Sequence, residues 1–157
     1  MSGGSPTTPP PAGTAPAANR NYALVAKHSN KCLDVDAWST VDSARLIQWS
    51  CHYGANEKFT LVNAGNNSYY LKSVHSGKCV DVEGSNTANG TKVQQYSCNQ
   101  TNAQRVTLTP TSGGAYNVRF ASSGKCLDVS GPSTADGAIV HQWDCVGGTN
   151  QEWFFRE

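Results

Sequence analysis

The sequence contains no long apolar segment, little charge and no cluster of basic residues. No window approaches the roughly 18 consecutive apolar residues of a membrane-spanning helix, so no transmembrane segment or membrane partner is predicted. The sequence has twelve basic and eleven acidic residues, which gives a net charge of +1. Because nucleic-acid binding needs a concentrated positive patch, no nucleic-acid partner is predicted either.

The first twenty residues lack the side chains that build a hydrophobic core. Ser2 to Asn19 are all serine, glycine, proline, threonine, alanine or asparagine. Such a segment buries little apolar surface, so residues 1–20 are predicted to be a disordered linker. No charged n-region and apolar h-region follow Met1, and we therefore interpret the chain as a module of a longer protein.

Residues 21–157 are one segment written three times. The six cysteines form two sets with the same step of 47 residues (79 − 32 = 98 − 51 = 47), namely Cys32, Cys79 and Cys126, and Cys51, Cys98 and Cys145. The copies therefore run over about 21–67, 68–114 and 115–157. Together they are long enough for one folded domain, whereas each copy alone is too small.

The repeat also predicts how the cysteines pair. Of the many possible connectivities, only pairing within each copy follows the repeat, which gives Cys32–Cys51, Cys79–Cys98 and Cys126–Cys145. Each bond closes a loop of about 20 residues and stabilises the fold by roughly 3 kcal/mol. No C-x-x-C pair is present, so no metal site is predicted. Disulfides indicate an oxidising, extracellular compartment.

Each copy shows the pattern of short strands. Alternation of apolar and polar residues, as at Leu33/Val35, is bounded by clusters of glycine, serine, threonine, asparagine and aspartate, which predicts about twelve strands in all. The second and third copies carry the hairpin dipeptides Asn-Gly and Asp-Gly, ending at Gly90 and Gly137. The first copy has Ser43 there, which is strained if the position requires a positive φ.

The residues that recur in all three copies are of the types that bind a pyranose sugar. An aromatic ring packs against the C–H face of a sugar, while a carboxylate and amides bind its hydroxyl rim. The candidate carbohydrate-binding residues are Asp34, Trp49, Asn56 and Glu57 in the first copy, Asp81, Gln94, Tyr96 and Gln104 in the second, and Asp128, His141, Trp143, Asn150 and Gln151 in the third.

The sequence does not indicate a catalytic site. No G-x-S-x-G motif is present, and of the four histidines only His28 and His75 share a column of the repeat. Glycoside hydrolysis needs two nearby carboxylates. The three copy-related aspartates are expected to lie far apart, and local pairs such as Asp34 and Asp36 have no evident apolar pocket. We therefore predict that the domain is not an enzyme and has no cofactor.

These motifs resemble the ricin-B-type lectin repeat, whose bacterial members are carbohydrate-binding modules of family 13. The resemblance rests on Cys-Leu-Asp-Val, an aromatic two residues before the second cysteine, and the Q-x-W motif that begins at Gln151. It covers residues 21–157 and implies a β-trefoil, with twelve strands forming a six-stranded barrel and three hairpins. It also implies one potential sugar site per copy.

The copies match the family motif unequally. The third copy matches it fully. The first has Ile47 in the column of His141, and Glu57 in place of Gln151, which removes an amide donor and adds charge near Asp34. The second has Ala103 in the column of Asn150. The expected order of site quality is therefore third, first, second.

The sequence thus predicts a secreted, monomeric carbohydrate-binding module with up to three weak sites. The resemblance implies galactose- or xylose-type pyranosides of polysaccharides as ligands, and a covalently linked glycoside hydrolase as the enzyme that is held on its substrate. Weak sites on one rigid body bind more tightly together than singly. A protein-interaction or inhibitor β-trefoil and a catalytic trefoil remain as alternatives.

Overall fold

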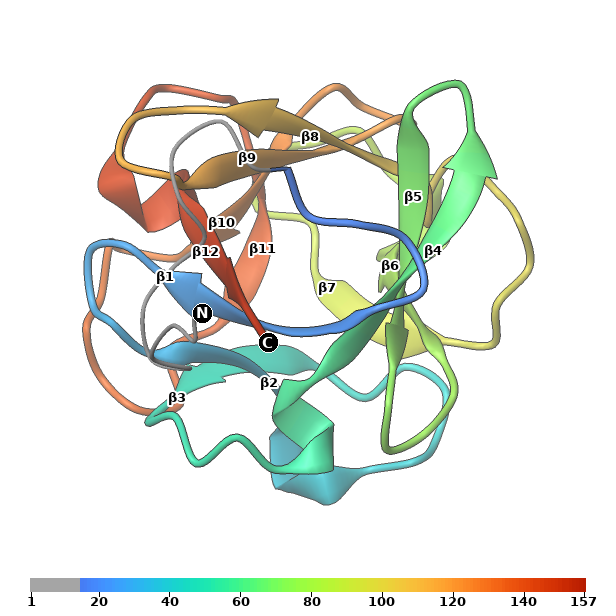
Figure 1. Ribbon diagram of the computed structural model, residues 1–157, viewed down its shortest axis with the longest axis horizontal. Coiled ribbons are helices and arrows are strands. Elements are labelled where there is room, and N and C mark those ends of the chain that lie inside the picture. The colour runs from blue at the N-terminus through green and yellow to red at the C-terminus, as the bar shows by residue number, and fades with distance from the viewer. Residues whose placement is uncertain (1–14) are drawn as a thin grey trace.

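The computed structural model describes residues 15–157, in which the regular secondary structure consists mainly of short strands joined by loops (Figure 1). Copy 1 contains β1 (Asn21–Ala26), β2 (Cys32–Val35), β3 (Leu46–Trp49) and β4 (Phe59–Gly65). Copy 2 contains β5 (Ser68–Ser73), β6 (Cys79–Val82), β7 (Val93–Tyr96) and β8 (Val106–Pro110). Copy 3 contains β9 (Tyr116–Phe120), β10 (Cys126–Val129), β11 (Val140–Trp143) and β12 (Trp153–Arg156). Short 3-10 turns are η1 (Asp36–Trp38), η2 (Ala55–Glu57), η3 (Glu83–Ser85) and η4 (Thr149–Gln151).

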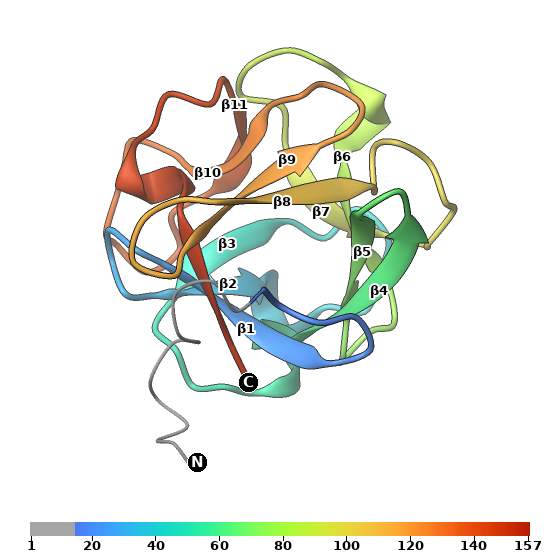
Figure 2. The same cartoon turned by 45° about the horizontal axis from the view of Figure 1, so that its top comes forward.

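Six of these strands close into a barrel. Around the ring, β1 pairs with β4, β4 with β5, β5 with β8, β8 with β9, β9 with β12 and β12 with β1, all antiparallel. The other six form the hairpins β2–β3, β6–β7 and β10–β11, which contact one another through β3, β7 and β11 (Figure 2). This architecture is the predicted β-trefoil. None of the helices in the described span is long and apolar enough to cross a membrane.

One hydrophobic core fills the barrel and extends under the hairpins. The barrel strands contribute large side chains that are fully buried, among them Phe59, Phe120 and Phe155. Trp153 of the Q-x-W motif is also buried, and its indole Nε1 donates to the carbonyl of Leu127 at 3.1 Å. The side chains that shape this core therefore come from all three copies, which explains why a single copy cannot form it.

Residues 15–20, which the sequence assigns to the linker, lie against the domain. The amide of Ala17 donates to Tyr22 Oη at 2.8 Å, and the amide of Asn19 donates to the carbonyl of Leu61 at 2.7 Å. Pro16 is buried. The remainder of the predicted linker, residues 1–14, lies outside the described residues.

The tip of each hairpin is hydrogen-bonded to the next copy. The amides of Ser43, Gly90 and Gly137 donate to the carbonyls of Gln95, Gln142 and Gln48, each at 2.8 Å. All three tip residues have a positive φ, of 74°, 85° and 89°. The cross-copy hydrogen bond therefore holds the turn in a left-handed conformation, which glycine adopts freely and serine does not.

Replacing Ser43 with glycine is expected to stabilise the fold by about 0.5–1 kcal/mol. Relief of the left-handed strain outweighs the entropy that glycine adds to the unfolded chain. Chemical denaturation measures the gain directly, and thermal unfolding should shift upward by about 3 °C. Gly137→Ser is the matched control and should lose a similar amount. A destabilised Ser43→Gly variant would contradict the strain argument.

Buried glutamines and disulfides complete the framework of each hairpin. Gln48, Gln95 and Gln142 accept hydrogen bonds from Ser29, Ser76 and Ser123 through Oε1, and each donates through Nε2 to two backbone carbonyls of another copy. The disulfides are Cys32–Cys51, Cys79–Cys98 and Cys126–Cys145, as the repeat predicts. Each hairpin is therefore fastened both within its own copy and to a neighbouring one.

Candidate functional site

The outer face of each hairpin brings a buried carboxylate and an exposed aromatic ring together. In copy 3, Asp128 lies opposite His141 in the β10–β11 register, and Trp143 follows two residues later on the same face. Asp128 is 5% exposed, whereas Trp143 is 40% exposed. The two other hairpins repeat this placement, with Asp34 beside Trp49 and Asp81 beside Tyr96. We name these arrangements sites 1, 2 and 3 after their copies.

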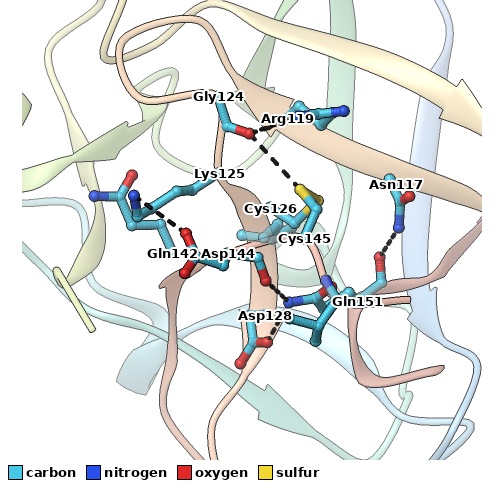
Figure 3. The surroundings of a disulfide bond; sticks show 12 residues. Asn117, Arg119, Gly124, Lys125, Cys126, Asp128, Gln142, Asp144, Cys145 and Gln151 are labelled. Carbon is cyan, nitrogen blue, oxygen red and sulfur yellow. Dashed lines mark hydrogen bonds and ion pairs between the residues drawn. A yellow bond between two sulfur atoms is a disulfide. The ribbon is translucent and has the colours of Figure 1, made fainter. Parts of the chain in front are cut away.

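Site 3 is a closed network of hydrogen bonds around Asp128. His141 Nε2 lies 2.8 Å from Oδ1, while Asn150 Nδ2 and Gln151 Nε2 donate to Oδ2 at 3.2 and 2.8 Å. Figure 3 shows Gln151 donating both to Asp128 and to the backbone carbonyl of Asp144, at 2.7 Å for the latter, beside the disulfide of this copy. These contacts fix the carboxylate in one orientation, occupy both acceptor positions of Oδ2 and leave one acceptor position on Oδ1 for a further donor.

The aromatic side of site 3 is also ordered by its neighbours. The rings of His141 and Trp143 stack at 5.5 Å with 26° between their planes. All five residues predicted for this copy therefore lie in one group. The edge of copy 2 adjoins them, because Lys92 pairs with His141 in an isolated bridge. Comparison of the copies did not predict this backbone contact with a neighbouring copy.

Site 2 keeps the carboxylate network but has fewer donors. Gln94 Nε2 and Gln104 Nε2 donate to the two oxygens of Asp81, at 3.1 and 2.9 Å. Ala103 occupies the place of the asparagine, and Asn102 accepts a hydrogen bond from Arg105 instead. Burial raises the pKa of Asp81, and the hydrogen bonds from the two glutamines oppose that rise. Site 2 thus lacks one of the amides that complete site 3.

Site 1 differs from the other two sites because it contains a second buried carboxyl group. Asp34 faces the apolar Ile47, and behind it lies Glu57, which is 0% exposed. Glu57 Oε1 accepts from the amides of His52 and Tyr53 at 2.8 and 3.2 Å. The fourth predicted residue, Asn56, donates to the carbonyl of Val35 at 3.2 Å, as Asn150 does to that of Val129 at 3.0 Å in copy 3.

The carboxyl group of Glu57 perturbs the ionisation of Asp34. Burial first, and the neighbouring carboxyl group of Glu57 second, raise the pKa of Asp34 to about 8. In the other copies a glutamine amide donates at this point. The replacement of glutamine by glutamate therefore turns a donor into a second acid, as the sequence predicts, and places it in a fully buried position.

Trp38 is a site 1 residue that comparison of the copies did not predict. It is 48% exposed and stacks on His52 at 5.7 Å and 15°, while its edge meets His75 at 5.2 Å and 90°. Together with Trp49 it lines a depression of about 310 Å³ that also contains Asp34. Its column holds serine and proline in the other copies, so a lone tryptophan in a polar turn was the available signal.

The chain is similar to proteins of one family over its whole folded length. Residues 13–96 match the family model described as ricin-type beta-trefoil lectin domain-like, and residues 67–157 match the ricin-type beta-trefoil lectin domain. No curated protein sequence matches the chain.

Solved structures agree with these matches. The designed threefold-symmetric protein ThreeFoil is 43% identical, with a TM-score of 0.86, over 87% of this chain and 98% of its own. An exo-beta-1,3-galactanase from Clostridium thermocellum is 33% identical, with a TM-score of 0.85, over 91% of this chain but only 31% of its own. A ricin B-like lectin of Macrolepiota procera, solved in complex with lactose, shares the fold at 20% identity, with a TM-score of 0.80 over 92% and 99%. The chain therefore belongs to the family of ricin-type β-trefoil lectin domains.

Proposed function

We propose that the domain binds carbohydrate through copy-related sites, of which site 3 is the strongest. The observation that carries this proposal is the exposed Trp143 ring beside the oriented Asp128 carboxylate. In a bound pyranose, a rim hydroxyl donates to Oδ1 of Asp128, while the C–H face of the sugar packs on the indole ring. Site 1 and site 2 bind in the same way with altered partners, and each contact is weak on its own.

We further propose galactose- or xylose-type pyranosides of polysaccharides as ligands. The exposed rings and fixed carboxylates suit a single sugar unit at each hairpin rather than a long groove. A lactose-bound lectin with this fold and a galactanase that contains a similar module are in keeping with the galactose-type ligand. Sites on three sides of one rigid domain allow one branched polysaccharide to engage several of them at once.

A linked glycoside hydrolase remains part of the proposal. The chain spans 31% of the galactanase, so in that enzyme a similar module is joined to a much larger remainder. The three disulfides suit a secreted module, and we propose that it is monomeric. The alternative of catalysis within this domain lacks support at site 1, because Glu57 is fully buried and is kept from a surface-bound sugar.

Loss of Asp128 is expected to weaken sugar binding at site 3 by about 10- to 100-fold. Charge-assisted hydrogen bonds contribute about 1.5–3 kcal/mol, and each 1.4 kcal/mol is roughly tenfold in affinity. The measurement is a glycan panel followed by titration of the best ligand, for Asp128→Ala and the more conservative Asp128→Asn. Circular dichroism verifies that both variants are folded.

Two further variants make the experiment decisive. Lys72→Ala, at an exposed position on β5, is the control and should bind as the unmodified chain does. The combination of Asp34→Ala, Asp81→Ala and Asp128→Ala should abolish binding to every polysaccharide in the panel. Unchanged binding by this folded triple variant would refute the lectin proposal and favour a protein-interaction role.

A further inference from the structure

Site 1 adds a histidine and a second acid to the aspartate that every copy possesses, which gives a set of three metal-ligating side chains found only in copy 1. His52 Nε2 lies 3.7 Å from Asp34 Oδ2 and 3.2 Å from Glu57 Oε2. All three ligand atoms lie within 4.8 Å of one another. The equivalent residues of His52 and Glu57 are Asn99 and Gln104 in copy 2 and Val146 and Gln151 in copy 3, so the acid–histidine–acid set is confined to copy 1.

One atom of this group lacks the partner that its burial demands. Glu57 Oε2 is shielded from solvent and receives no hydrogen bond, although Oε1 of the same carboxylate accepts two. In copies 2 and 3 an amide Nε2 occupies this position and donates to the aspartate. Copy 1 therefore has an acceptor where the others have a donor. Burying a carboxylate oxygen without a donor is costly, and a bound cation removes that cost.

The spacing of the three atoms suits a transition metal. Two ligands bound tetrahedrally at about 2.0–2.1 Å from Zn²⁺ lie about 3.4 Å apart. The distances of 3.2 and 3.7 Å from His52 Nε2 bracket that value. A set of one imidazole and two carboxylates matches the donor preferences of Zn²⁺. The stacking of Trp38 on His52 at 15° orients the plane of the imidazole. Its Nδ1 accepts a hydrogen bond from the amide of Gly54 at 3.0 Å, so metal binding through Nε2 moves the ring proton to Nδ1 and breaks this one bond.

We propose that Asp34, His52 and Glu57 form a divalent metal site that takes Zn²⁺. Asp36 and Asp136 add negative charge near Asp34 and increase the attraction for a cation. Asp34 and His52 both line the depression between Trp38 and Trp49, so the remaining coordination position opens toward it. The sequence did not predict this site, because Asp34, His52 and Glu57 do not form a short metal-binding motif and only copy 1 contains all three.

The proposal is tested by titrating the chelator-treated chain with Zn²⁺ alone in a calorimeter, in a buffer that does not bind the metal. We expect one equivalent to bind per chain and to raise the unfolding temperature. Glu57→Gln and His52→Ala should each weaken this binding at least 100-fold. Substitution with Co²⁺ should give the absorption of a tetrahedral complex in the unmodified chain and lose it in both variants.

The controls separate this site from adventitious binding. Glu57→Gln restores the residue type of the other copies and should fold, which a thermal melt verifies. His75→Ala removes a histidine that touches Trp38 but not the three ligands, and it should bind Zn²⁺ normally. Absence of Zn²⁺ uptake, or equal uptake by the chain and Glu57→Gln, would overturn the proposal. Because no glycan is present, this result is independent of whether the domain binds sugar.

Discussion

Reduction of the three disulfides is expected to lower the free energy of unfolding by about 9 kcal/mol. Each bond joins cysteines 19 residues apart, so each removes a similar amount of chain entropy from the unfolded state, roughly 3 kcal/mol. The stability of a domain of this size is about 5–15 kcal/mol. Reduction should therefore bring the domain close to the point at which the unfolded chain predominates at 37 °C.

The measurement is denaturant unfolding of the oxidised and reduced chain, followed by near-ultraviolet circular dichroism. Cysteine-to-serine variants that remove one pair at a time provide the internal control. Because the three loops have equal length, the three paired variants should lose nearly equal stability. A reduced chain with unchanged unfolding midpoint would contradict the entropy argument and indicate that the core alone holds the fold.

Most of the fold could be predicted because each sequence feature occurs in three copies that can be compared. The step between Cys32 and Cys79 recurs between Cys79 and Cys126, so one alignment fixes the copy boundaries and the disulfide pairs. Strand alternation is local, and it predicts the hairpins without knowledge of what they pack against. The closure of the barrel could be predicted only from the family resemblance. It depends on the pairing of β1 with β12, the first and last strands in the sequence.

The candidate sites could be predicted less completely, because several of their contacts join segments distant in sequence. Column matching identifies Asp128, Trp143 and Gln151, since these residues recur at fixed spacings. It cannot identify Lys92 beside His141, since that contact joins two copies. Nor does it predict the position of Trp38, which depends on a turn with a φ of 57° at this residue.

Glu57→Gln is expected to stabilise the metal-free fold by about 3 kcal/mol above pH 8. The variant gives Asp34 the amide donor that Asp81 and Asp128 already have, and it removes a second acid that is fully buried. Leaving a buried charge without a partner costs about 3–5 kcal/mol. Denaturant unfolding of both proteins in the presence of a chelator measures the difference.

The pH dependence follows from the pKa of Asp34. Its value of about 8 in the fold exceeds the ordinary 3.8, because of burial first and of Glu57 second. Between these values the folded chain holds a proton that the unfolded chain has lost, so the stability contributed by this group falls as the pH rises. The facing groups His52, Asp36 and Asp136 remain unchanged in the variant. The advantage of Glu57→Gln should therefore be small near pH 4, grow through this window and level off above pH 8.

The reciprocal change in copy 2 tests whether the effect comes from the pair of acids. Gln104→Glu places a carboxyl group beside Asp81, where Gln94 still donates to the other oxygen. It should destabilise the fold over the same range of pH in which Glu57→Gln stabilises it. If Glu57→Gln has a constant effect from pH 4 to pH 9, Glu57 does not raise the pKa of Asp34. The difference between the copies would then lie in packing rather than in charge.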